Sequence, residues 1–245
     1  MDILSTSSQV VDLGRMDYEP VRKIQLELVR RRKESDIGNF LIFVEHNPVY
    51  TIGRKADPAN FKGINPLRTE RGGDVTYHGP GQLVTYIVMD IRRDGRLDVR
   101  GFVNAVTENF ISAIRSFGFD AHGGVSEPGI WVGRNQSRKV GSIGMAIDQW
   151  VSYHGVAVNI SKETVDPFRA IRPCGMDPEV MSYIPVERTE LMKRLTNQFE
   201  NMMGKLIPVD KNHLLSVLDL SPDLPDSLLD AKSLVGDDSL HKEER

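Results

Sequence analysis

The sequence predicts an α+β protein with a mixed, largely antiparallel β-sheet flanked by helices. Two observations support this prediction. Strand-like and helix-like segments follow one another without regular β-α-β alternation, and three consecutive strand-like segments are joined by short polar turns. Short turns favour antiparallel neighbours, because parallel strands need long crossover connections. The chain has 245 residues, 40% of them hydrophobic, which is enough to bury a sizeable core.

The first half of the chain predicts one helix and three strands. Residues 17–35 carry apolar side chains at helical spacing, with basic residues around them. The apolar run FLIFVEH (40–46) predicts a short buried strand that an Asn-Pro pair ends. VYTIGRKAD (49–57) predicts another short strand with a glycine turn, and QLVTYIVMDI (82–91) alternates as a strand does.

The second half predicts two helices around three strands. The strands are GIWVGR (129–134), KVGSIGMAID (139–148) and VSYHGVAVNI (151–160). One helical stripe, ended by Gly118, comprises Phe102, Val106, Phe110, Ala113 and Phe117. A second, near the C-terminus, comprises Leu191, Leu195, Phe199 and Met202.

The composition indicates how the chain is divided into domains and which classes of protein are excluded. Residues 1–220 are expected to form one domain with a small C-terminal helical part, and the acidic, Pro- and Ser-containing segment 221–245 a loosely held tail. A net charge of −3 argues against a nucleic-acid partner, and no apolar run is long enough for a membrane span. Cys174 is the only cysteine, and no secretory signal is visible, so a reducing cytoplasm is expected.

The segment RGGDVTYHGPGQ (71–82) concentrates glycines and polar side chains. A Gly-Gly pair lets the backbone approach a ligand closely, while Arg71 supplies a cation and His78 a polar ring. The segment is neither a Walker-A loop nor a dinucleotide fingerprint. A ligand-binding loop and an ordinary long hairpin connection both fit this composition.

Cys174 and Lys139 are the candidate reactive groups. A lone cysteine is commonly a small buried apolar residue, but Pro173 and Gly175 predict an irregular loop here, and the neighbouring Arg172 favours the thiolate. Lys139 begins a strand; it is either a solvated charge or, if desolvated beside a cysteine, a base. His46, His78 and His154 lack the spacing of metal ligands, so no metal is expected.

Together the motifs resemble one family, the lipoyl(octanoyl) transferases, which are similar in fold to the catalytic domain of lipoate and biotin protein ligases. The resemblance runs from about residue 11 to 204. It rests on six motifs in the order of the family: VEHNPVYTIGR, RGGDVTYHGPGQLVTY, GIWVGR, RKVGSIGMAI, YHGVAVNI and IRPCGM.

The resemblance implies an enzyme that moves octanoate, or a lipoyl group, from acyl carrier protein to a lysine of a lipoyl domain. Such domains belong to 2-oxoacid dehydrogenase complexes and the glycine cleavage H protein. The family pattern assigns the thioester to Cys174 and acid-base catalysis to Lys139, so Sγ is expected within hydrogen-bonding reach of Nζ. No cofactor, metal or ATP is expected.

The family pattern also implies a set of substrate contacts. They are Arg71, Gly72, Gly73, Asp74, Val75, Thr76, Tyr77, His78, Ser142, Ile143, Gly144, Gly155, Val156 and Ala157. Two alternatives are an ATP-dependent ligase and a non-catalytic fatty-acid carrier, which has no use for a Cys–Lys pair. Because acyl carriers are acidic, the RRRK run (30–33) and Arg92–Arg93 are docking candidates.

Overall fold

A mixed eight-stranded sheet forms the centre of the structure, a computed structural model that describes residues 7–35, 37–93, 96–124, 127–134 and 138–220. In order across the sheet, the strands are β13 (Ile207–Pro208), β1 (Gln9–Met16), β2 (Phe40–His46), β6 (Gln82–Asp90), β12 (Val151–Asn159), β11 (Arg138–Asp148), β10 (Ile130–Val132) and β9 (Ala121–Gly123). From β2 to β9 all pairs are antiparallel, whereas β1 pairs in parallel with both β2 and β13. The predicted fold class is confirmed.

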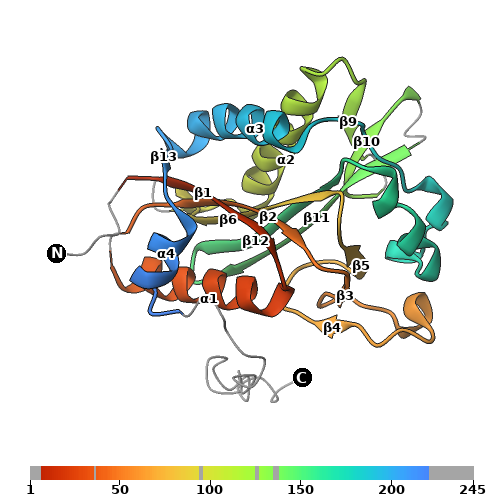
Figure 1. The fold of residues 1–245 in the computed structure, drawn as a ribbon, viewed down its shortest axis with the longest axis horizontal. Coiled ribbons are helices and arrows are strands. Elements are labelled where there is room, and N and C mark those ends of the chain that lie inside the picture. Colours follow the sequence, from red (N-terminus) through yellow and green to blue (C-terminus); the bar gives the residue numbers. More distant parts are fainter. Residues whose placement is uncertain (1–6, 36, 94–95, 125–126, 135–137, 221–245) are drawn as a thin grey trace, which may run out of the picture.

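Helices cover both faces of this sheet (Figure 1). On one face lie α1 (Tyr18–Glu34) and α4 (Lys211–Val217), and on the other α2 (Val99–Arg115) and α3 (Arg188–Met203). Strand β2 contributes side chains to the hydrophobic cores on both faces of the sheet, because successive side chains of a strand point to opposite faces. Leu41 and Phe43 join the core under α2 and α3, while Ile42 joins the core under α1. This explains why the strand is apolar at nearly every position.

The predicted helices are confirmed, with differences at their ends. Helix α2 stops at Arg115, so Phe117 lies in the turn after it and packs against the core only in part. In α3 the last buried residue of the apolar stripe is Met203 rather than the expected Met202, which is half-buried.

The predicted antiparallel neighbours 139–148 and 151–160 form a hairpin, β11–β12. Its two-residue turn consists of Gln149 and Trp150, both at positive φ (43° and 79°). Such a turn matches the twist of paired strands. The hairpin holds Gly144 directly opposite Gly155.

A three-stranded sheet lies beside the main one, in the order β4 (Leu67–Arg68), β3 (Val49–Ile52) and β5 (Val75–His78). Residues 75–78 were expected within a loop, and that expectation is wrong, because β-branched and aromatic residues here pair antiparallel with β3. A two-residue pair, β7 (Arg92–Arg93) with β8 (Arg96–Leu97), is separate. The short 3₁₀ helices are η1 (Pro58–Phe61), η3 (Lys162–Thr164), η4 (Asp166–Ala170), η5 (Pro173–Gly175) and η6 (Pro178–Val180).

Strands β1 and β13 were not predicted. Their partners lie far along the chain: Gln9 pairs with Phe40 and with Ile207. The expected tail, 221–245, lies outside the described residues. Among the residues that the structure describes, no helix is long and apolar enough to cross a membrane.

Gly155 lies where β12 passes close to β6, and this predicts an effect on stability. A Cβ at this position would lie 2.0 Å from the Thr85 carbonyl oxygen, so Gly155→Ala must push two central strands apart. We expect the free energy of unfolding to fall by about 2–3 kcal/mol, measured by urea denaturation.

Gly123→Ala is the matched control, because it adds the same methyl group to a strand of the same sheet. Its Cβ would meet no atom closer than 3.9 Å, at Ile111. Equal stability of Gly155→Ala and Gly123→Ala would show that the close approach of β12 to β6 does not constrain the fold.

Candidate active site

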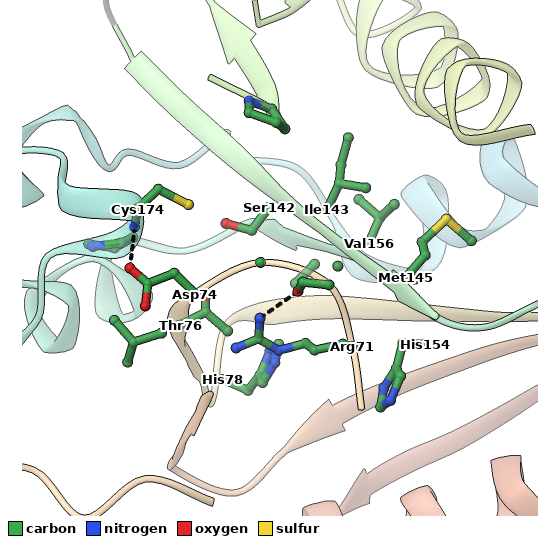
Figure 2. A pocket seen from close by; sticks show the side chains of 18 of the residues that line it. Arg71, Asp74, Thr76, His78, Ser142, Ile143, Met145, His154, Val156 and Cys174 are labelled. Carbon is green, nitrogen blue, oxygen red and sulfur yellow. Dashed lines mark hydrogen bonds between the residues drawn. The ribbon is translucent and has the colours of Figure 1, made fainter. Parts of the chain in front are cut away.

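A cavity of about 600 Å³ lies where the three-stranded sheet, the β11–β12 hairpin and the loop after β12 meet (Figure 2). In this view Cys174 and Asp74 lie at one side of the pocket, and Met145 and His154 lie at the other. The structure brings fifteen of the sixteen predicted site residues to its wall, which are Arg71, Gly72, Gly73, Asp74, Val75, Thr76, His78, Lys139, Ser142, Ile143, Gly144, Gly155, Val156, Ala157 and Cys174.

Tyr77 is the predicted residue that does not line this cavity. Its ring packs instead against Tyr50, with ring centroids 5.2 Å apart, and edge-on against Phe168 at 6.0 Å. The reason is strand alternation in β5, which sends the Tyr77 side chain away from the neighbouring His78 and into a separate small core. The Tyr77 side chain is therefore absent from the cavity wall, and the expected substrate contact at Tyr77 stays a prediction.

Residues 71–74, here called the glycine loop, contact β11 through their backbone. The Gly72 amide donates a hydrogen bond to the Met145 carbonyl oxygen at 2.8 Å, so it is not free for a ligand. A Cβ on Gly144 would lie 3.3 Å from the Gly72 carbonyl oxygen and 3.1 Å from Arg71 Cδ. Glycine at 144 thus lets the loop close over the hairpin.

Arg71 is a buried cation beneath this loop. Its guanidinium donates to the Thr51 carbonyl oxygen at 2.7 Å, to Thr51 Oγ1 and to the Gly72 carbonyl oxygen at 3.0 Å. Within the described part of the chain no carboxylate lies within 4.0 Å of it. Arg71 therefore holds the loop by neutral acceptors and keeps its positive charge at the cavity wall.

Cys174 is held in a strained turn with its side chain exposed to the cavity. It lies within η5 at φ 55° and ψ 29°, a left-handed conformation that residues other than glycine adopt at a cost. Its amide donates to Asp74 Oδ2 at 3.1 Å. Asp74 also accepts from the Asn60 side-chain amide and from the Asp57 backbone amide at 3.1 Å. One buried carboxylate therefore joins the glycine loop, the segment of η1 and the cysteine turn.

Lys139 is buried at the start of β11, with 3% of its surface exposed. Burial lowers the pKa of its amine, while the charges of Cys174 and Glu127 oppose that shift. Nζ donates to the Pro128 carbonyl oxygen at 2.8 Å. Room for this contact comes from Gly129, where a Cβ would lie 2.5 Å from Lys139 Cε. Burial therefore shifts the amine toward its neutral form, which is the form that acts as a base.

Lys139 and Cys174 line the same cavity, but their expected hydrogen bond is absent from the contacts of the described residues. A buried ammonium needs an acceptor, and the Pro128 carbonyl supplies one, whereas the Cys174 side chain is solvent-exposed. The two groups are close enough for the charge on Cys174 to act on Lys139.

Tyrosines and histidines form a polar cluster in the wall of the cavity. Tyr18 stacks on His78 with centroids 5.8 Å apart, and the Tyr86 hydroxyl and a ring nitrogen of the adjacent His46 are 2.7 Å apart. Burial raises the pKa of Tyr18 to about 12 and lowers the pKa of His46 to about 4 and of His78 to about 3. The cluster is therefore uncharged at neutral pH.

Sequence reasoning missed Tyr18 and Tyr86 as cavity residues. Tyr18 begins α1 and Tyr86 lies in the middle of β6, and no local pattern links them. The three histidines do come together around them, with His46 and His78 centroids 5.9 Å apart. In the described ranges no group of three His, Cys, Asp or Glu side chains has an arrangement that could hold a metal ion.

The sequence profile of the lipoyl protein ligase A/B catalytic domain matches residues 17–200. The chain belongs to this family. An octanoyltransferase from Methylococcus capsulatus is 42% identical over 166 residues, covering 66% of this chain and 77% of that protein. An octanoyltransferase from Laribacter hongkongensis is 35% identical over 201 residues, covering 79% of this chain and 94% of that protein. The chain is accordingly an acyltransferase, as its motifs implied.

Solved structures of lipoate protein ligases share the fold. A lipoate-protein ligase A bound with ATP superposes with a TM-score of 0.64 at 17% identity, covering 87% of this chain and 93% of that one. A bi-partite lipoate protein ligase from Thermoplasma acidophilum superposes with a TM-score of 0.63 at 15% identity, covering 87% of this chain and 91% of that one. At these identities the likeness concerns the fold alone.

The buried histidines predict a loss of stability on acidification. Histidines of the unfolded chain take up protons near pH 6.5, while His46 and His78 stay neutral in the fold until about pH 4 and 3. Because the unfolded state binds more protons, the free energy of unfolding should fall as the pH drops from 6.5 to 5. Each ring contributes a slope of up to about 1.4 kcal/mol per pH unit.

The variant His78→Gln should reduce this slope by up to one ring's share, measured by urea denaturation at several pH values. His213→Gln, which changes an exposed histidine on α4, is the matched control and should keep the wild-type slope. Identical slopes for wild type and His78→Gln would contradict the assignment of a buried neutral ring.

Proposed function

We propose that residues 1–220 form a catalytic domain that transfers an octanoyl group from acyl carrier protein to a lysine of a lipoyl domain. The proposal assigns the acyl-enzyme thioester to Cys174 and the acid-base role to Lys139. The observation that carries it is the placement of an exposed thiol and a buried amine on one cavity with apolar walls.

The first step exchanges one thioester for another. The Cys174 thiolate attacks the carbonyl carbon of the donor thioester, the Sγ–C bond forms, and the bond from carbon to the carrier sulfur breaks. The departing carrier thiolate takes a proton from the Lys139 ammonium, which leaves the amine neutral. No nucleotide is required, because the donor is already activated.

The second step forms the amide. The neutral amine of the acceptor lysine attacks the thioester carbonyl, the Cys174 thiolate leaves, and the proton of the attacking nitrogen passes to Lys139. The lowered pKa of Lys139 supports this role, since burial keeps its amine able to accept that proton.

The oxyanion of each tetrahedral intermediate needs hydrogen-bond donors. The Cys174 amide is engaged by Asp74 and the Gly175 amide by the Arg172 carbonyl oxygen. The Gly73 amide lines the cavity and donates no hydrogen bond to another described residue. We therefore assign Gly73 as the backbone donor to the oxyanion.

The acyl chain is assigned to the apolar wall of the cavity. This wall comprises Val84, Val103, Ile143, Met145 and Val156. Each methylene group that leaves water contributes about 0.8 kcal/mol, so an eight-carbon chain gains several kcal/mol. The expected substrate contacts along 71–78, 142–144 and 155–157 support this placement, apart from Tyr77.

Two alternative functions make different demands on the site. An ATP-dependent ligase activates free octanoate and needs no cysteine nucleophile, and a fatty-acid carrier needs neither Cys174 nor Lys139. A strained cysteine turn held by a buried carboxylate supports the transferase, since strain of this kind is found at functional sites.

Mixing the protein with octanoyl-carrier protein should give an octanoyl adduct on Cys174, detected by intact mass and peptide mapping. Cys174→Ser should slow amide formation on a lipoyl domain by at least about 10³-fold, because a serine hydroxyl is a far weaker nucleophile than a thiolate.

The control reaction replaces the donor with free octanoate and ATP. Amide formation there at a rate comparable with that from the carrier would favour the ligase. Undiminished transfer by Cys174→Ser would exclude the thioester route.

Lys139→Met keeps the length and burial of the side chain but removes its amine. Acyl transfer should fall by about 10²–10⁴-fold while the protein remains folded, measured as initial rates with the thermal midpoint as a control. Lys193→Met on α3, which removes an exposed amine, should leave the rate unchanged. Near-normal turnover in Lys139→Met would remove this lysine from the mechanism.

A further inference from the structure

Three exposed cations surround the cysteine end of the cavity. Lys55 lines the cavity itself, Arg172 lies two residues before Cys174, and Lys62 follows η1. Within the described part of the chain, none of the three has a carboxylate within 4.0 Å. We call these residues the rim cations. Unpaired surface charge of one sign is a means of attracting a partner of the opposite sign.

The cations of α1 are different, because carboxylates already pair with them. Arg30 contacts Glu27 and Glu34, and Lys33 Nζ lies 2.7 Å from an oxygen of Asp148. The same holds for Arg31, Arg32 and Arg92, in the pairs Arg31–Glu27, Arg32–Asp90 and Arg92–Asp90, whereas the side chain of Arg93 lies outside the described part of the structure. The docking candidates suggested by the sequence are thus largely neutralised within the fold.

Two of the rim cations, Lys55 and Arg172, are fixed relative to Cys174 through the backbone. The Lys55 amide donates to the Gly73 carbonyl oxygen at 3.1 Å, and the Arg172 amide donates to the Asn60 carbonyl oxygen at 2.8 Å. Asn60 in turn donates to Asp74, which holds the Cys174 amide. A partner bound to these cations is therefore placed at a defined position beside the thiol.

A second cavity, of about 500 Å³, lies next to the first and shares Asn60 with it. Its wall includes Lys62, Arg169 and Arg172. Arg169 forms ion pairs with Asp166 and Glu179, with nitrogen–oxygen distances of 3.9 and 3.6 Å. The acidic residues of the two walls on this side are Asp57, Asp74 and Asp177. Their carboxylates accept hydrogen bonds from amide groups of the chain, so they do not pair with Lys55, Lys62 or Arg172.

We propose that the rim cations Lys55, Lys62 and Arg172 form the docking surface for an acidic carrier protein that presents the acyl thioester on a phosphate-containing arm. This inference rests on the proposed function and adds the place where the donor binds. Acidic side chains of the carrier face Lys55 and Lys62, and the cavity beside Arg172 accepts the negative end of the arm. The apolar chain then enters the first cavity.

The test compares two variants that lose the same charge. Lys55→Gln/Lys62→Gln removes two rim cations, and Arg30→Gln/Lys33→Gln removes two cations from α1. Loading of Cys174 is followed by intact mass from octanoyl-carrier protein and, separately, from the N-acetylcysteamine thioester of octanoate. Transfer to a lipoyl domain is then measured from enzyme preloaded with the small thioester.

The rim variant should load from the carrier at least about tenfold more slowly than wild type at low salt, and this difference should shrink as salt is added. Its loading from the small thioester and its transfer to the lipoyl domain should match wild type, and the α1 variant should match wild type in all three assays. Failure of wild type to load from either donor would instead refute the proposed function.

Three results would overturn the docking proposal. They are wild-type loading of the rim variant from the carrier, an equal defect in the α1 variant, and a defect confined to transfer onto the lipoyl domain. The last result would assign the rim cations to the acceptor.

Discussion

The site depends on one buried carboxylate, that of Asp74. It accepts hydrogen bonds from the backbone of Asp57, the side chain of Asn60 and the backbone of Cys174. These donors come from segments up to 117 positions apart in the chain, counted from residues 57 to 174. Because a buried carboxylate is costly without donors, the three segments are held together, and the strained conformation of the cysteine turn is maintained.

A second constraint is the removal of charge from the interior of the cavity. Burial keeps His46 and His78 neutral and Tyr18 un-ionised, and it lowers the pKa of Lys139. Arg71 keeps its charge because neutral oxygens of Thr51 and Gly72 satisfy it. The same desolvation that keeps these rings neutral shifts the amine of Lys139 toward its neutral form, which can act as a base.

The glycines around the cavity act mainly by leaving space, which neighbouring backbone or side-chain atoms occupy. Gly144 admits the glycine loop, Gly129 admits the side chain of Lys139, and Gly155 admits the backbone of the adjacent strand. In each case a Cβ would occupy space that a catalytic or structural group now fills. The motifs therefore encode close approach between segments at least as much as direct contact with a ligand.

Local patterns in the sequence determined the helices, most of the antiparallel strands and the set of motifs that surrounds the cavity. Periodic apolar residues and short turns report on neighbours along the chain, and spaced glycines report on tight contacts, so these features were predictable. The family resemblance added the identity of Cys174 and Lys139, and the cavity contains both.

Only the tertiary structure decided the parallel pairing of β1, the packing of Tyr77 into a separate small core, the entry of Tyr18 and Tyr86 into the cavity wall, and the acceptor of Lys139. Each of these depends on atoms that are distant in sequence. It also decided which cations remain unpaired, since a charge run looks the same in sequence whether or not carboxylates reach it. Local propensity carries no information about such long-range partners, because they are set by packing.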